Sequence, residues 1–359
     1  MHALAPGAAR YALALLLVLS LLAAVLVPGQ QVASDRTREL QSAQGAANVE
    51  DQGDMALYRR VAARVAQGEN YYAAATDENR RANYPTKPFV TIRLPTLTLL
   101  TVWLGESGMR MGLIALLLAN AALLPMALAR GGQALGVGAA TLAGGAAVMA
   151  ADAYLMHEMW AGALLTLSFA LWRAHRWWPA IIPAVLALTI RETALPFVLL
   201  WGAFATYRGN WREALAIAMV VVGFGFGIVD HASAVSGAWL AGDKSGQGWA
   251  GLLGPAPFLQ GVHMLTVLVV LPAWVAGPVA VLALFGFAAR GGRAGWFALL
   301  YAIGVMAMLA LFARAENWYW TALVLPLLLA GLALAPMGLA DLIAPLRAAH
   351  GSGRNRDDG

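Results

Sequence analysis

Long apolar runs alternate with short polar segments along almost the whole chain of 359 residues. After a first run at 11–27, apolar runs cover 89–104, 108–129, 133–151, 158–172, 177–190, 193–207, 211–229, 259–289, 295–313 and 318–344. A run of about 20 apolar residues is long enough to cross the hydrocarbon core of a bilayer as a helix. The pattern therefore predicts an all-α polytopic membrane protein.

One long polar segment, 51–95, interrupts this pattern. Wound as a helix from Asp54, it places Asp54, Tyr58 and Val61 on one face, as helical periodicity requires. Gly68 is expected to end that helix. Function is therefore sought first in this segment.

The distribution of arginines predicts which loops are cytoplasmic, because positively charged loops stay inside. The alternation of basic and less basic loops holds from residue 130 onward, but it fails upstream if 89–104 and 108–129 both cross. The run 89–104 is short and contains Arg93 and Pro95. It is therefore predicted to lie in the headgroup plane as an interfacial helix, which leaves about ten spans with both termini cytoplasmic.

The predicted organisation is one transmembrane domain with two large external loops and a tail. Its parts are the domain 1–344, the first external loop 28–107 with its interfacial helices, the second external loop 230–258, and a disordered cytoplasmic tail, 345–359. The run 259–289 is expected to be a single span, broken or bent at Pro272 and Pro278, since a hairpin there would break the alternation. Glycine tracts such as Gly223-x-x-x-Gly227 and Gly136-x-x-x-Ala140 predict close helix packing.

Composition narrows the function classes. Only 12% of residues are charged, against roughly 25% in soluble domains. The net charge of +5 follows from the cytoplasmic arginines, so nucleic acid is not an expected partner. Without cysteine, thiolate chemistry is excluded. A divalent metal is possible but unsupported, since Asp51 and Asp54 are a thin basis for such a site, and no cofactor is predicted.

The remaining titratable residues collect on the predicted external side. Asp54 either caps its helix and complements the helix dipole, or acts as a base on a hydroxyl nucleophile at the membrane surface. Arg191 is costly to bury unpaired, so either Glu192 and a neighbouring span satisfy it or it binds an anionic headgroup.

Two further groups present the same choice between anchoring and binding. His157 and Glu158 stand at the start of a predicted span, close to Trp160. They either form a helix-starting acid with an interfacial aromatic, or they take part in binding. Arg314 and Glu316 precede an aromatic belt at 318–320. His231, Lys244 and His263 are weaker candidates.

The segment Asp54-x-x-x-Tyr58, followed by Ala62, Gly68, Tyr71-Tyr72 and Tyr84-Pro85 before an apolar run ending at Leu104-Gly105, resembles the first external loop of the GT-C superfamily of membrane glycosyltransferases. Glu158, Arg191-Glu192 and Arg314 before a helix bearing Pro326 are similar features. The chain departs from that pattern in having Thr86 after Tyr84-Pro85 and no Asp-x-Asp pair.

The resemblance implies an inner-membrane glycosyltransferase of the cell envelope that uses a polyprenyl-phosphate-linked sugar donor and a lipid or glycan acceptor on the periplasmic face. It implies inversion, with Asp54 as base, Arg191 and Arg314 on the donor phosphate, and Tyr58, His157, Glu158, Glu192 and Glu316 as further substrate-binding residues. The alternatives are a lipid-linked saccharide flippase or exporter and a non-catalytic membrane subunit. The sugar and the acceptor cannot be read from the sequence.

Overall fold

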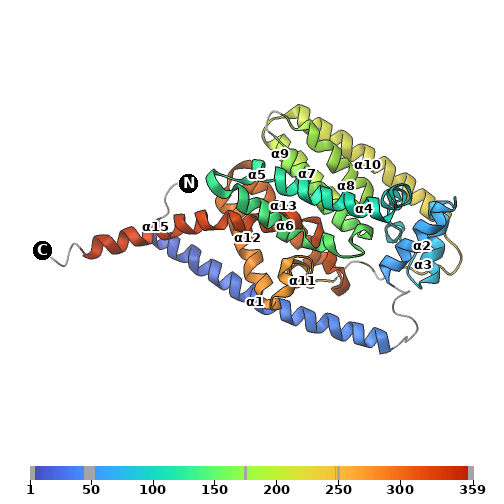
Figure 1. Ribbon diagram of the computed structural model, residues 1–359, viewed down its shortest axis with the longest axis horizontal. Helices are drawn as coiled ribbons and strands as arrows, with labels where there is room; N and C mark the ends of the chain where they lie inside the picture. The colour runs from blue at the N-terminus through green and yellow to red at the C-terminus, as the bar shows by residue number, and fades with distance from the viewer. Residues whose placement is uncertain (1–4, 44–52, 174–175, 247, 249–250, 355–359) are drawn as a thin grey trace. The chain divides into compact units, whose positions relative to one another are not determined.

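The computed structural model describes residues 5–43, 53–173, 176–246, 248 and 251–354. All regular elements in these ranges are helices (Figure 1). The helices form two compact units, each assembled from separate stretches of chain. Unit 1 comprises Met1–Ser34, Ala121–Ala146 and Leu252–Gly359, and unit 2 comprises Asp35–Asn120 and Ala147–Gly251. The single domain 1–344 predicted from the sequence is thus divided in two.

The α-helices of unit 2 are α2 (Asp54–Ala66), α3 (Tyr71–Arg81), most of α4 (Thr96–Leu123), α7 (His157–Leu171), α8 (Ile181–Ile190), α9 (Leu195–Tyr207) and α10 (Trp211–Gly237). Those of unit 1 are most of α1 (Pro6–Ala43), α5 (Pro125–Leu128), α6 (Ala134–Gly144), α11 (Ala256–Met264), α12 (Ala276–Arg290), α13 (Gly292–Phe312), α14 (Leu325–Leu328) and α15 (Ala335–Arg354). Short 3₁₀ helices join them: η2 (Phe89–Thr91), η3 (Gly131–Gln133), η4 (Ala146–Met149), η5 (Ala153–Leu155), η6 (Trp178–Ala180), η7 (Glu192–Ala194), η8 (Val267–Val270), η9 (Ala273–Val275), η10 (Ala315–Leu323) and η11 (Leu329–Ala333).

Several helices are long and apolar enough to cross a membrane. In the described part of the chain these are six: Pro6–Val27, Phe89–Leu128, Trp211–Gly237, Ala273–Arg290, Gly292–Phe312 and Leu325–Ala349. Their number is that of a multi-pass membrane protein. The helices α7, α8 and α9 have 15, 10 and 13 residues, so each extends only roughly 15–22 Å, less than a bilayer core of about 30 Å. The count of about ten spans stays a prediction.

Helix α4 breaks at Gly105, where φ is 67° and ψ is 172°. Glycine adopts this backbone conformation without the steric cost that a Cβ would bring. The part before the break is seen nearly end-on in Figure 1, and the part after it runs lengthwise. The break falls between the runs 89–104 and 108–129 that the sequence separates. The membrane-surface position of the first part stays a prediction.

The segment 259–289 is broken around Pro272, as the sequence allowed, and its single crossing of the membrane stays a prediction. Helix α11 ends at Met264 and α12 begins at Ala276. The intervening chain, which contains Pro272, forms two short 3₁₀ helices. Pro278 falls in the first turn of α12, where backbone N–H groups have no helical partner and proline is tolerated. The proline at 272 therefore separates two helices, and the proline at 278 bends none.

The C-terminal tail also differs from expectation. Helix α15 continues to Arg354, so residues 345–354, predicted to be disordered, are helical. Residues 355–359 lie outside the described residues.

Glycines allow close approach in unit 1, as predicted for the tract at 131–145. A Cβ added at Gly136 would lie 3.3 Å from Cβ of Ala333, and one added at Gly144 would lie 2.5 Å from the carbonyl oxygen of Leu325. The prediction fails for Gly223 and Gly227 in unit 2. No described atom lies within 4 Å of a Cβ added at either, so these glycines do not mark a helix contact.

Local signals fix the start of unit 2. Helix α2 begins at Asp54 and ends at Ala66, just before Gly68 with its φ of +89°, as the sequence predicted. Helix α3 begins after Asn70, whose side chain accepts hydrogen bonds from the backbone N–H groups of Tyr72 and Ala73. Such a cap satisfies donors that the first helical turn leaves unpaired.

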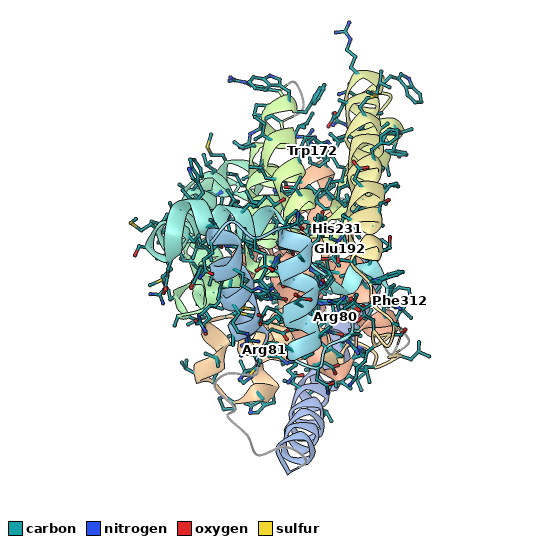
Figure 2. All side chains as sticks on the ribbon, turned by 90° about the vertical axis from the view of Figure 1, so that its right-hand side faces the viewer. Arg80, Arg81, Trp172, Glu192, His231 and Phe312 are labelled. Carbon is teal, nitrogen blue, oxygen red and sulfur yellow. The ribbon has the colours of Figure 1, made fainter. Side chains whose placement is uncertain are left out.

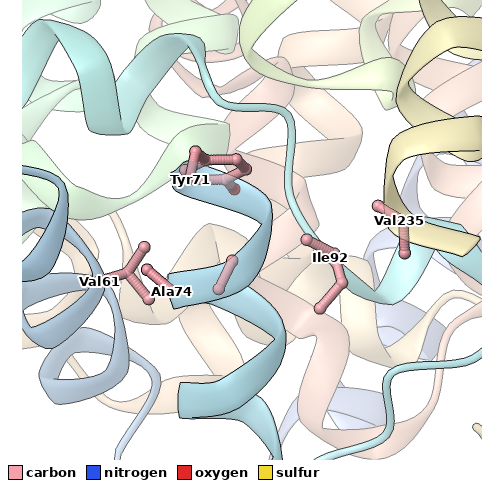
Figure 3. Close-up of a cluster of buried hydrophobic side chains, with 6 residues drawn as sticks. Val61, Tyr71, Ala74, Ile92 and Val235 are labelled. Carbon is pink, nitrogen blue, oxygen red and sulfur yellow. The ribbon is translucent and has the colours of Figure 1, made fainter. Parts of the chain in front are cut away.

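A cluster of buried apolar side chains holds these two helices against the chain around residue 92 and the end of α10. Its members are Val61, Tyr71, Ala74, Ala75, Ile92 and Val235 (Figure 3). Fully burying an aliphatic side chain contributes about 1.5–3 kcal/mol. The amphipathic faces of α2 and α3 thus determine how the polar segment docks on the apolar helices of unit 2.

A buried carboxylate in the first turn of α10 contacts the end of α7 and the middle of α9. Glu213 is fully buried, and its Oε1 accepts hydrogen bonds from the indole N–H groups of Trp172 at 2.5 Å and Trp201 at 2.6 Å. Asn210 donates to its Oε2 at 2.7 Å. Because its acceptor positions are occupied, Glu213 is explained by packing alone.

Candidate functional site

Polar side chains from four parts of unit 2 meet beside the polar segment. They are Tyr58 of α2, Arg93 from the chain before α4, His157 and Glu158 at the start of α7, and Arg191 and Glu192 between α8 and α9. We call this group the charged cluster. Five of its six members were predicted as site residues, and Arg93 was not.

Arg191 is the most enclosed member, with a side chain only 1% exposed. Its Nε donates to Oε1 of Glu158 at 2.6 Å, and its Nη1 pairs with the carboxylate of Glu192. The pair with Glu158 is almost fully buried. Two carboxylates therefore satisfy Arg191, as the structural interpretation of the sequence expects. The guanidinium is thus enclosed by protein, and its predicted contact with an anionic headgroup stays a prediction.

The rings of Tyr58 and His157 are in contact. Their centroids lie 4.9 Å apart in an edge-to-face arrangement, which is favourable for aromatic pairs. His157 is 2% exposed, and neither of its ring nitrogens makes a hydrogen bond of good geometry among the described residues, although the backbone of Leu155 is close to the ring. A buried polar group left unsatisfied costs about 1–3 kcal/mol. Such a group calls for a specific explanation, such as an ordered water, an ion or a role in function.

Arg93 is half-buried and brings positive charge to the same place. Its Nε donates to the hydroxyl of Tyr58 at 3.2 Å. It also lies close enough to His157 and Glu192 to act on both electrostatically. The sequence showed Arg93 only as an unexpected charge in an apolar run. Its role depends on Tyr58, which lies 35 positions away.

Asp54 lies in the first turn of α2, four residues before Tyr58. Residues four apart on a helix share a face, so Asp54 is on the face that carries Tyr58. It is half-buried. Among the described residues, no hydrogen bond or ion pair joins Asp54 to the charged cluster. The helix-capping and catalytic interpretations of Asp54 both remain compatible with this position. Asp51 lies outside the described residues.

His231 extends the cluster toward α10. It was predicted in an external loop starting at residue 230, but α10 continues to Gly237 and buries it. Its Nε2 lies 3.1 Å from the carbonyl oxygen of Ile92, and its Nδ1 lies 3.3 Å from the hydroxyl of Tyr72. Glu192 is near enough to interact with it electrostatically, and Figure 2 shows the two side by side.

Arg314 and Glu316 belong to unit 1. Nε of Arg314 lies 3.2 Å from Oε1 of Glu316, and both side chains are substantially exposed. Their predicted part in the same site stays a prediction. Trp160, beside Glu158, was predicted to lie at the membrane interface. It is instead buried in the protein, and its indole N–H donates to the carbonyl oxygen of Tyr154 at 2.9 Å.

The segment after α10 is fastened to the end of α3. Nε of Arg80 donates to Oδ1 of Asp243 at 2.7 Å, and this hydrogen bond holds the pKa of the Asp243 carboxyl well below its usual range. Lys244 is exposed, and its Nζ donates to the side-chain oxygen of Asn83. Trp239 donates its indole N–H to the carbonyl oxygen of Thr86 at 3.0 Å. These contacts hold the segment after α10 against α3 and the chain that follows α3.

The arrangement combines the guanidinium of Arg93, the hydroxyl of Tyr58 and the buried imidazole of His157 near the helix-starting carboxylate of Asp54. Within the described residues, no group of three or more His, Asp or Glu side chains could hold a metal ion.

A comparison of the chain with protein-family models, curated proteins and solved structures found no match.

Proposed function

We propose that this chain is a membrane glycosyltransferase that moves one sugar, with inversion, from a polyprenyl-phosphate-linked donor to an acceptor hydroxyl. The observation that carries the proposal is the contact of Arg93 with Tyr58, on the helix face that begins with Asp54. It gives a cation and a carboxylate to one face of the polar segment. Transfer from a sugar phosphate needs both charges.

The reaction assigns a task to each charge. The acceptor hydroxyl gives its proton to the carboxylate of Asp54 while its oxygen forms a bond to the anomeric carbon of the sugar. The bond from that carbon to the phosphate oxygen breaks, and its electron pair stays on the polyprenyl phosphate. The guanidinium of Arg93 stabilises this charge as it develops. Attack from the face opposite the leaving group inverts the anomeric centre.

This assignment changes the expected phosphate ligand. Arg191 is enclosed by Glu158 and Glu192, so it serves to position the start of α7 and the turn between α8 and α9. Arg93 takes the phosphate instead. His157, unsatisfied and buried next to Tyr58, is suited to bind a hydroxyl of the sugar. Arg314 in unit 1 stays a second predicted phosphate ligand.

Purified full-length protein in lipid nanodiscs, incubated with a panel of radiolabelled polyprenyl-phosphate sugars, tests the proposal. We expect one donor to lose its sugar to an added lipid extract. Arg93→Gln should weaken binding of that donor by about 10- to 150-fold, because a charge-assisted hydrogen bond contributes roughly 1.5–3 kcal/mol. Arg59→Gln is the matched control, since Arg59 is an exposed arginine of α2 paired with Asp152. Equal donor binding by both variants would contradict the role of Arg93.

A further inference from the structure

A cavity of about 590 Å³ opens between α8 and α10 in unit 2. Its apolar lining comes from Leu94, Pro95, Val185, Leu188, Met219, Val220, Gly223, Phe224, Gly227 and Ala234. From Met219 to Asp230 the cavity follows twelve residues of α10, or roughly 16 Å between the first and the last. A long apolar cavity beside a membrane-crossing helix is suited to one lipid chain.

Two glycines keep this cavity open. Gly223 and Gly227 lie one turn apart on the wall formed by α10, and no described atom lies within 4 Å of a Cβ added at either. Gly225, between them, is not part of the lining. The glycines that the sequence assigned to helix packing thus leave space for a chain, and Gly225 provides a control position on the same helix.

The cavity becomes polar where Tyr72, Asp230 and His231 line it. The Tyr72 hydroxyl lies 3.3 Å from Nδ1 of His231. Burial, and next the nearby Asp230 carboxylate, raise the pKa of Tyr72, so it is a neutral hydroxyl at pH 7. Thr96 and Thr189 add two more hydroxyls.

No Arg or Lys is among the described residues that line the cavity. Arg93 precedes the lining residue Leu94 but is not itself in the lining, so a phosphate inside the cavity would meet the carboxylate of Asp230 without a cation among the lining residues. Like charges brought together at an interface cost several kcal/mol. Hydroxyl groups, in contrast, find both donors and acceptors in Tyr72, His231 and Asp230. The charge at the polar end therefore selects an uncharged, hydroxylated head.

We propose that this cavity binds a lipid with one apolar chain and an uncharged, hydroxyl-bearing head. That this lipid is the acceptor of the sugar rests on the proposed function. The polar end is continuous with the charged cluster, because His231 contacts the carbonyl oxygen of Ile92, next to Arg93. A lipid head bound at this end places a hydroxyl beside Arg93, the proposed ligand of the donor phosphate. The donor phosphate itself stays outside the cavity.

Photo-crosslinking of the full chain in nanodiscs tests this proposal, with a dodecyl glucoside that carries a diazirine in its chain and the matching dodecyl phosphate as probes. We expect the glucoside to label α8 and α10 and the phosphate to label them at least about tenfold less. The double variant Gly223→Leu/Gly227→Leu should lose the labelling, because the leucines fill the cavity. Gly225→Leu should keep it.

Charge reversal adds a second readout. Asp230→Lys should raise the labelling of α8 and α10 by the dodecyl phosphate relative to that by the dodecyl glucoside. Equal or stronger labelling by the phosphate in the wild type, or full glucoside labelling of the double glycine variant, would overturn the proposal. Selective labelling by a protein that transfers no sugar would refute the proposed function and leave the lipid site standing, so the two failures are distinguishable.

Discussion

Nε of Arg191 lies 2.6 Å from Oε1 of Glu158, and both side chains are almost fully enclosed by protein. The pair links the turn between α8 and α9 to the start of α7. Removing one partner of a buried ion pair leaves an uncompensated charge, which costs about 3–5 kcal/mol. The same charges separated by solvent would contribute about 0–1 kcal/mol. This pair therefore determines whether the charged cluster holds its shape.

Arg191→Met should lower the thermal unfolding temperature of the detergent-solubilised protein markedly, because it leaves Glu158 buried without its partner. The double variant Arg191→Met/Glu158→Met should recover part of that loss, since replacing a buried pair by apolar groups of similar size is often neutral. Unfolding followed by tryptophan fluorescence measures both. If Arg191→Met unfolds at the wild-type temperature, the pair does not stabilise the unit.

Asp54→Asn should lower sugar turnover by about 10²–10⁴-fold, the usual contribution of a positioned general base. Asparagine keeps the shape of the side chain and much of its capping ability, so the unfolding temperature should change little. Asp51→Asn is the control and should retain most activity. Turnover is measured with a donor that the wild type uses. Substantial turnover by Asp54→Asn would show that this carboxylate is not the base.

Acid should weaken the attachment of the segment after α10. The Arg80 guanidinium depresses the pKa of Asp243 in the folded protein, so the stabilisation is complete above the unfolded value of about 4 and is lost as the pH falls below it. The unfolding temperature should therefore drop progressively as the pH falls from about 4 toward 2, and less steeply in Asp243→Asn. Parallel curves for the two proteins would show that Asp243 does not contribute.

The topology around Gly105 can be measured with reporter fusions. A reporter active only in the periplasm should be active when joined after Glu106 and inactive when joined after Arg130. The reason is that the first part of α4 is predicted to lie along the membrane surface and the second part to cross it. An inactive reporter at Glu106 would place the first part across the bilayer and reverse the alternation upstream of it.

The sequence alone determined the class of protein and the local boundaries of many helices. Apolar runs specify membrane helices, because each unpaired backbone group in lipid is costly. Helix α2 begins at Asp54 and ends before Gly68 because a first-turn carboxylate and a left-handed glycine act within one turn of chain. The sequence also identified Arg191 and Glu158 as charges in apolar segments, which are expected either to be ion-paired or to bind a ligand.

Only the tertiary structure decided which charges are paired. Glu158 lies 33 positions from Arg191, and Ile92 lies 139 positions from His231. Spacing along the chain carries no information on such contacts, because they depend on how separate helices pack. Packing also placed Arg93 beside Tyr58, divided the chain after Met264, and left Gly223 and Gly227 facing a cavity. Glycines permit either a helix contact or an open wall, and the neighbouring elements determine which one forms.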